Sequence, residues 1–152
     1  MTNVLLQTTM GDVKIELFDD RMPITTGNFR KLVETHFYDG TVFHRVIAGF
    51  MIQGGDPEGT GYGGPGYAIK DELPTDNRNA RGTISMANAG PNTGGSQFFI
   101  NVVDNARLDR KHPAFGRVVS GMDVVDAISR TPTGDSDRPK KTVTILKAAL
   151  VP

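Results

Sequence analysis

Short runs of apolar and β-branched residues recur along the chain, and each is bounded by Gly, Pro, Asn or Asp. In the clearest run, Val13, Ile15 and Leu17 alternate with charged residues, which is the period-2 pattern of a half-buried strand. Many short strands with regular turn signals are typical of a sandwich or a barrel. We therefore expect a mainly β fold, with strands over residues 4–7, 13–17, 42–46, 51–53, 82–86, 97–102, 115–119 and 143–150.

Two segments follow a helical period instead. Phe29, Leu32 and Phe37 recur at helical spacing after Pro23, which predicts a helix over residues 25–37. Ser120 to Asp123 suits a capped helix start, and Met122, Val125 and Ile128 then share one face. We expect these two helices to cover the open ends of a barrel.

Length and composition limit the classes of protein that remain. A chain of 152 residues fits one domain, here residues 1–152, with no linker or repeat inside it. Cysteine is absent, so disulfides, a thiolate nucleophile and a Cys-based zinc site are excluded, and a reducing compartment, the cytoplasm, is expected.

Charge and hydropathy disfavour two kinds of partner. The 17 basic and 17 acidic residues balance, so no long-range attraction to nucleic acid or to anionic membranes is expected. No apolar run is long enough for a membrane span, and the first residues lack the basic and apolar regions of a signal peptide. A monomer is favoured because no apolar stripe is left outside the candidate site.

Glycines concentrate between Gly54 and Tyr67, where Gly59, Gly61 and Gly64 match the dinucleotide pattern G-x-G-x-x-G. That pattern binds a pyrophosphate only between a strand and a helix, and here it runs into Pro65 with no helical period behind it. We therefore interpret the segment as a long surface loop beside a groove, and keep a dinucleotide enzyme only as an alternative.

Other chemistries have weaker support. His36, His44 and His112 lack the spacing of a metal-ligand pair, so we expect no metal and no cofactor. A Ser-His-Asp arrangement stays open, since sequence does not show proximity, although no G-x-S-x-G motif supports it.

Two segments together supply a distinctive set of side chains. Residues 43–56, FHRVIAGFMIQGGD, place a single arginine, Arg45, among apolar residues, and residues 85–99, SMANAGPNTGGSQFF, add carboxamides and aromatic rings. Taken singly, the apolar members are ordinary core residues and Arg45 is an ordinary solvent-facing or carboxylate-paired arginine. As a set, they could grip a proline ring and polarise its peptide bond.

These segments, with LDRKHPAFGRVVSGMDVVDAI downstream and the opening TTMGDVKIELF, closely resemble the cyclophilin-type peptidyl-prolyl cis-trans isomerases. The loop GTGYGGPGYAIKDEL is similar to that of compact bacterial or archaeal single-domain members. The resemblance implies a closed eight-stranded antiparallel β-barrel capped by two α-helices, with the active groove on its outer face. It implies a site made of Arg45, Phe50, Met51, Gln53, Gly59, Ala87, Asn88, Ala89, Gln97, Phe99, Leu108 and His112.

The chemistry of these residues suits the implied activity. Arg45 is the candidate donor to the prolyl nitrogen of a twisted amide, with Gln53 and Asn88 as the other candidate catalytic residues. Phe50, Met51, Phe99 and Leu108 offer an apolar pocket for the proline ring, closed by the edge of His112. Gln97 and the main chain of residues 87–89 can bind an extended peptide without reading its side chains.

The resemblance also implies partners. Proline-containing peptides and unfolded or folding proteins are the expected substrates, while a peptide-binding scaffold with incidental turnover is the alternative. Arg107 occupies the position before Leu108 where many eukaryotic relatives carry a tryptophan, so only weak cyclosporin binding is expected. Ala48 replaces a common proline, which bears on loop rigidity more than on chemistry.

Overall fold

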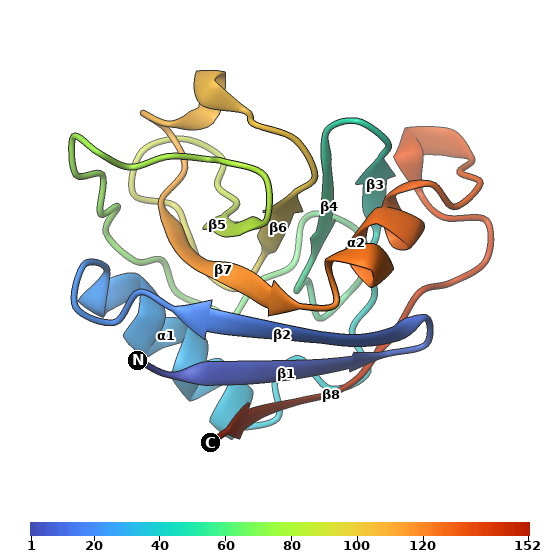
Figure 1. The fold of residues 1–152 in the computed structure, drawn as a ribbon, viewed down its shortest axis with the longest axis horizontal. Helices are drawn as coiled ribbons and strands as arrows, with labels where there is room; N and C mark the ends of the chain where they lie inside the picture. The colour runs from blue at the N-terminus through green and yellow to red at the C-terminus, as the bar shows by residue number, and fades with distance from the viewer.

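The computed structural model describes residues 1–152, and a single sheet of eight antiparallel strands dominates it (Figure 1). Val13, Ile15 and Leu17 are all buried, as their alternation predicts. The strands are β1 (Asn3–Thr8), β2 (Gly11–Leu17), β3 (Arg45–Ile47), β4 (Met51–Gly54), β5 (Thr83–Met86), β6 (Phe98–Asn101), β7 (Ala114–Ser120) and β8 (Ile145–Val151).

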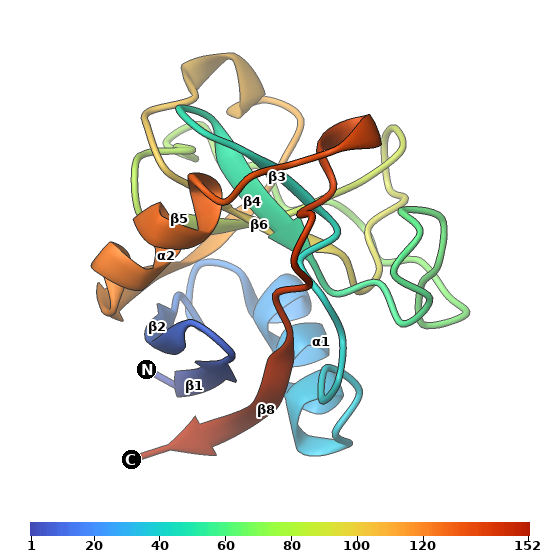
Figure 2. The ribbon, with the colours of Figure 1, turned by 90° about the vertical axis from the view of Figure 1, so that its right-hand side faces the viewer.

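The sheet is strongly curled but open, so the prediction of a closed barrel is wrong. Its strand order is β3-β4-β6-β5-β7-β2-β1-β8, and the end strands β3 and β8 do not pair with each other. The chain before β3 meets the start of β8 only in an isolated bridge between Val42 and Thr144 and its flanking hydrogen bonds. At Arg45, where β3 begins, the two segments are no longer paired. Figure 2 shows that β8 extends away from β3.

Two α-helices lie on different sides of the curled sheet, with α1 (Pro23–Glu34) against β7 and β8 and α2 (Met122–Ser129) against β2, β3 and β4 (Figure 1). Helix α1 begins before the predicted Thr25 because Pro23 suits the first helical position. It ends before Phe37 because His36 adopts a left-handed backbone with φ of 63°. Two short 3-10 turns, η1 (Ala106–Leu108) and η2 (Asp135–Asp137), were not predicted.

The start of each helix depends on a contact outside its own turn. In α1 the Glu72 carboxylate accepts hydrogen bonds from the main-chain N–H groups of Ile24 (3.1 Å) and Thr25 (2.7 Å), which satisfies helix donors that no local side chain caps. Helix α2 follows Gly121, where φ is 89° and a Cβ atom would lie 2.2 Å from the carbonyl oxygen of Asp12. Only glycine fits that turn.

The hydrophobic core fills the inside of the curled sheet beneath the helices. Phe29 of α1 packs against Tyr38, Phe98 and Phe115, with ring centroids 5.1, 5.7 and 5.1 Å away respectively. The Tyr38 hydroxyl donates to the carbonyl oxygen of Ser96 at 2.9 Å, so its one polar group is satisfied. The core therefore ties α1 to β6 and β7.

Neither helix has the length and apolar character needed to cross a bilayer.

Candidate functional site

A groove of about 420 Å³ opens on the outer face of the sheet, and we call it the main groove. Strand alternation explains why its side chains point outward: Ile52 and Phe98 belong to the core, whereas their neighbours Met51, Gln53 and Phe99 line the groove. Arg45 pairs with Gln53 in register, and Gln53 with Phe99, which sets these three in one row. The groove is lined by Arg45, Phe50, Met51, Gln53, Ala87, Asn88, Phe99, Arg107, Leu108 and His112.

The main groove has an apolar end. Met51 and Phe99 are almost fully buried, with 2% and 4% of their surface exposed, yet they belong to the groove and not to the core cluster. The His112 ring stands edge-on to Phe99 with centroids 5.2 Å apart. His112 Nδ1 lies 3.0 Å from the carbonyl oxygen of Met86, so Nδ1 carries the proton and donates, because a carbonyl only accepts. This end suits a small apolar ring.

The other end is polar and is organised by a chain of hydrogen bonds. Arg45 Nη1 donates to Gln53 Oε1 at 3.4 Å, and Gln53 Nε2 donates to Gln97 Oε1 at 3.0 Å. Gln97 Nε2 then donates to the carbonyl oxygens of Gly61 and Gly63, each at 2.9 Å. The arginine is thereby connected to the glycine-rich loop.

A second hollow of about 360 Å³, the loop hollow, shares Gln53, Ala87 and Asn88 with the main groove. The sequence-predicted residues Ala89 and Gln97 line it, together with the loop from Gly61 to Pro65. An extended chain lying in the main groove can therefore continue into this hollow.

The segment 87–89 is less available to a ligand than expected. The N–H of Ala87 already donates to the carbonyl oxygen of Gln97 at 3.0 Å, and that of Ala89 to Thr93 Oγ1 at 2.8 Å. The Asn88 side chain donates to the carbonyl oxygen of Lys111 at 2.8 Å, which ties the two walls of the main groove together. The main-chain N–H and carbonyl oxygen of Asn88, which lines both hollows, make no backbone hydrogen bond.

Gly59 is the predicted site residue that the structure does not bring to either hollow. It is buried, its carbonyl oxygen accepts a hydrogen bond from Arg138, and its φ is 67°. Its place is in the base of the loop, because that backbone conformation favours glycine.

Comparison with known proteins agrees with this geometry. The family model described as "Cyclophilin type peptidyl-prolyl cis-trans isomerase/CLD" matches residues 3–150. The chain belongs to this family. It is therefore a cyclophilin-type peptidyl-prolyl cis-trans isomerase.

Curated relatives match this cyclophilin along almost its whole length. "Peptidyl-prolyl cis-trans isomerase-like 1" of Gibberella zeae is 48% identical, covering 99% of this chain and 95% of the relative. "Peptidyl-prolyl cis-trans isomerase ppi1" of Schizosaccharomyces pombe is 49% identical, covering 97% and 98% respectively. Both relatives are thus similar to the chain over the groove as well as the sheet.

Solved structures agree in fold. The cyclophilin type peptidyl-prolyl cis-trans isomerase of Cryptosporidium parvum superimposes with a TM-score of 0.96 at 35% identity, over 99% of this chain and 98% of that one. The same protein in the presence of the dipeptide Ala-Pro gives a TM-score of 0.95 at 36% identity, over 99% of both chains.

The glycine-rich loop of this cyclophilin is organised by one buried carboxylate. Asp56 is fully buried and accepts hydrogen bonds from four main-chain N–H groups, those of Glu58, Thr60, Gly61 and Gly63, at 2.6 to 3.2 Å. Burial by itself raises the pKa of Asp56, but the N–H donors outweigh burial and leave the pKa below its ordinary value of 3.8. Asp56 therefore stays ionised and fixes the loop that Gln97 contacts.

His44 lies buried between this loop and the groove strand. Burial lowers its pKa from 6.5, Asp56 acts in the opposite direction, and Arg138 and Arg45 lower it further. Its Nδ1 has no hydrogen-bond partner. None of the three histidines is hydrogen-bonded to a serine, and no group of three or more histidine and acidic side chains is placed to hold a metal ion.

Several supporting residues were not found from the sequence. Asn105 Nδ2 donates to the carbonyl oxygen of Phe50 at 3.0 Å and to Asn101 Oδ1 at 2.8 Å. Asn77 Nδ2 donates to the carbonyl oxygens of Asp109 and His112 at 2.7 and 3.0 Å. These buried asparagines hold the main chain behind the groove. Their low exposure is the one signal that identifies them, because asparagine is ordinarily a surface residue.

Arg107 was expected to affect cyclosporin binding but was not placed among the site residues. Its guanidinium lies 5.0 Å from the centre of the Phe50 ring, within the range of a cation–π contact, and it forms part of the wall of the main groove.

Proposed function

We propose that this cyclophilin rotates X-Pro peptide bonds without covalent chemistry, and that Arg45 stabilises the twisted amide. The observation that carries the proposal is that one groove contains both the Arg45 guanidinium and an apolar slot formed by Phe50, Met51 and Phe99. The slot can hold a proline ring while the cation reaches the bond that turns.

The barrier to be lowered is that of the amide itself. Rotation about a peptide bond costs about 18 to 20 kcal/mol, so spontaneous X-Pro exchange takes tens to hundreds of seconds. At the top of this barrier conjugation is lost, and the lone pair localises on the prolyl nitrogen. A hydrogen bond donated to that nitrogen is strong only in the transition state, and it therefore accelerates exchange.

Arg45 is suited to that role by its chemistry and by its support. A guanidinium stays charged at all relevant pH values and offers several donors in one plane. Gln53 Oε1 accepts from Nη1, which leaves the other N–H groups for a substrate. The Arg45 side chain is exposed, so a bound peptide that covers it will strengthen its hydrogen bond by excluding water.

The remaining groups hold the substrate on either side of the turning bond. Leu108 and His112 close the apolar end, and Gln53, Asn88 and Gln97 offer carboxamide and main-chain contacts along the loop hollow. Because these polar contacts can be made with peptide main chain, proline is the one required element of the substrate. We propose proline-containing peptides and unfolded or folding proteins as substrates, with the protein acting as a cytoplasmic monomer.

The test compares Arg45→Ala with wild type in two-dimensional exchange NMR on an Ala-Pro peptide. Removing a transition-state donor is expected to lower the exchange rate by about 10² to 10³. Peptide binding, followed by chemical shifts of groove residues, should weaken much less. Arg130→Ala, which removes an exposed arginine at the end of α2, serves as the matched control and should keep wild-type turnover.

Equal turnover in Arg45→Ala and wild type would contradict the role of Arg45. Wild type that binds the peptide but does not accelerate exchange would instead support the alternative, a scaffold that binds proline segments.

A further inference from the structure

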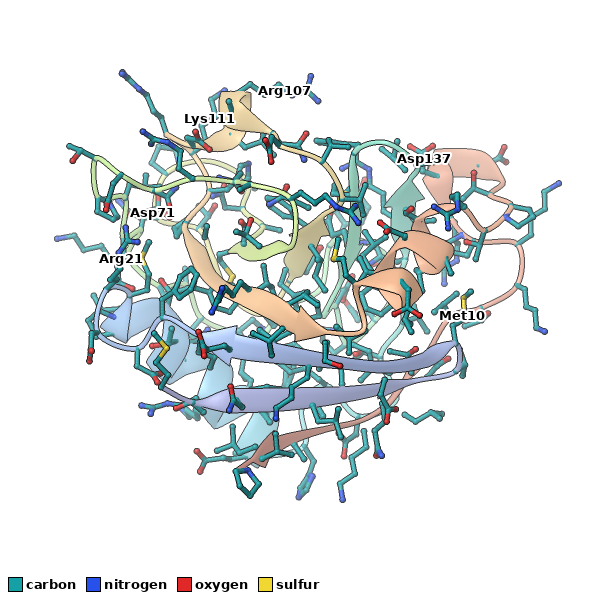
Figure 3. The ribbon with its side chains drawn as sticks, viewed as in Figure 1. Met10, Arg21, Asp71, Arg107, Lys111 and Asp137 are labelled. Carbon is teal, nitrogen blue, oxygen red and sulfur yellow. The ribbon has the colours of Figure 1, made fainter.

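Four basic side chains gather beside the main groove. Arg78, Arg107, Arg110 and Lys111 line a third hollow of about 950 Å³, which we call the basic hollow. All four are exposed. Arg107 also lines the main groove, so the two spaces are adjacent. Figure 3 shows Arg107 and Lys111 projecting outward at the same corner of the molecule, around η1.

Acidic side chains around this cluster have other partners. Asp109, the one acid that lines the basic hollow, accepts from the N–H of Asn79 at 2.6 Å. Asp76 pairs with Arg21 at 2.6 Å. Glu72 holds the start of α1 through Thr25, and Asp71 accepts from the N–H of Asn92 at 2.9 Å. None of these carboxylates contacts the four cations.

The cations themselves have no acidic partner. The ion pairs of the protein involve Arg21, Arg30, His36, Arg81 and Arg117, and none of the four residues of the basic hollow. Since the whole chain has 17 basic and 17 acidic residues, this corner is locally positive on a protein without net charge. Such a patch attracts anions at short range.

We propose that the basic hollow binds an anionic side chain carried by the same peptide whose proline occupies the main groove. This inference rests on the proposed function and specifies its substrate class: proline segments flanked by acidic or phosphorylated residues. Because Arg107 borders both spaces, a residue only a few positions from the proline can reach the hollow, given about 3.3 to 3.6 Å per extended residue.

A peptide fits these observations better than a nucleic acid. No aromatic side chain lines the basic hollow, whereas single-stranded nucleic acids are usually held by stacking of bases on aromatic rings. The hollow also adjoins the apolar slot, which has no role in phosphate-backbone binding. The anion is therefore expected to arrive as part of the substrate chain.

The experiment uses five peptides built around Ala-Pro: one neutral, one with three glutamates before the proline, one with three after it, one with phosphoserine before the proline and one with phosphoserine after it. Binding and exchange are measured by NMR at low salt and at 0.5 M salt. We expect one glutamate peptide to bind at least about fivefold more tightly than the neutral peptide at low salt, and this gain to vanish at high salt. A gain for phosphoserine alone would assign the site to phosphate, and a gain for both to anions in general.

The variant Arg110→Gln/Lys111→Gln should lose this gain while keeping wild-type exchange of the neutral peptide. Neither side chain makes a hydrogen bond within the protein, so folding should be unaffected. Lys140→Gln/Lys141→Gln removes the same charge from another exposed pair and should retain the gain.

The inference would be overturned by no gain for any anionic peptide, by the same gain in the Arg110→Gln/Lys111→Gln variant, or by equal loss in the Lys140→Gln/Lys141→Gln control. Two competitors are then compared for their ability to displace the bound glutamate peptide: a single-stranded RNA and a glutamate peptide without proline. If the RNA displaces it at the lower concentration, the hollow is assigned to nucleic acid and the inference is overturned. Absence of exchange with the neutral peptide would count against the proposed function instead.

Discussion

Gln53 and Gln97 face one another across the boundary between the main groove and the loop hollow, and Gln53 Nε2 donates to Gln97 Oε1 at 3.0 Å. Arg45 at one end of this chain of hydrogen bonds can only donate, and the carbonyl oxygens of Gly61 and Gly63 at the other end can only accept. The orientation of both carboxamides is therefore determined. The position of Arg45 depends on a loop of which it is not a part.

Gln97→Met tests this dependence. Methionine has a similar length but cannot accept from Gln53 or donate to the loop, so two carbonyl oxygens lose a donor. We expect the free energy of unfolding to fall by about 1 to 3 kcal/mol, since three hydrogen bonds are lost and each is typically worth about 1 kcal/mol. Because Arg45 loses its indirect support, kcat should fall more than KM rises in the exchange assay. Gln7→Met, at an exposed position of β1 far from the groove, is the control. Unchanged kcat in Gln97→Met would show that Gln53 alone positions the arginine.

Asp56→Asn tests the buried carboxylate of the loop. Asparagine has one acceptor oxygen in place of two, so some of the four N–H donors lose their partner. We expect a loss of about 1 to 3 kcal/mol in the free energy of unfolding at pH 7, measured by urea denaturation. Asp135→Asn, at an exposed position in η2, should change stability little.

The same carboxylate predicts a pH dependence. The folded-state pKa of Asp56 lies below its ordinary value of 3.8, so the unfolded chain binds the proton more readily. Its contribution to stability is complete above pH 3.8 and is lost as the pH falls through the folded-state pKa. Below pH 4, wild type should therefore lose stability more steeply than Asp56→Asn. Parallel acid profiles for the two proteins would mean that folding leaves the pKa of Asp56 unchanged.

Arg107→Trp tests the wall of the main groove. The arginine lies over the Phe50 ring, and a tryptophan there would offer a flat apolar face with one N–H donor. We expect cyclosporin to bind this variant at least about tenfold more tightly than wild type by calorimetry, which corresponds to about 1.4 kcal/mol. Arg107→Leu, which adds apolar surface without the donor, should give a smaller gain. Equal affinities of all three proteins would show that another part of the groove limits binding.

The local elements were largely predictable. Alternation along residues 13–17 places three apolar side chains in the core, and the same rule separates Ile52 from Met51 and Gln53. The helix predictions erred mainly at their ends, because Pro23 and the left-handed backbone of His36 set the limits of α1. The opening of the sheet was not predictable from these patterns, since it depends on how far apart β3 and β8 come to lie.

The site was predicted as a set of residues rather than as an arrangement. Phe50, Phe99 and His112 lie together in the main groove, whereas Gly59 lies in the base of the loop. Asn77 and Asn105 support the groove through main-chain carbonyl oxygens distant in sequence, and a single sequence gives no signal for such contacts.

The sequence by itself determined the residue types and the side of each strand on which they lie, because strand and helix periods are local properties of the chain. It placed an arginine, carboxamides and apolar rings on the outer side of short strands. Only the tertiary structure decided which of them act together. The link from Arg45 through Gln53 and Gln97 to Gly61 joins residues from three separate segments, and the cluster of cations around Arg107 joins two. Such contacts depend on long-range strand pairing and loop closure, which the local pattern of residues does not encode.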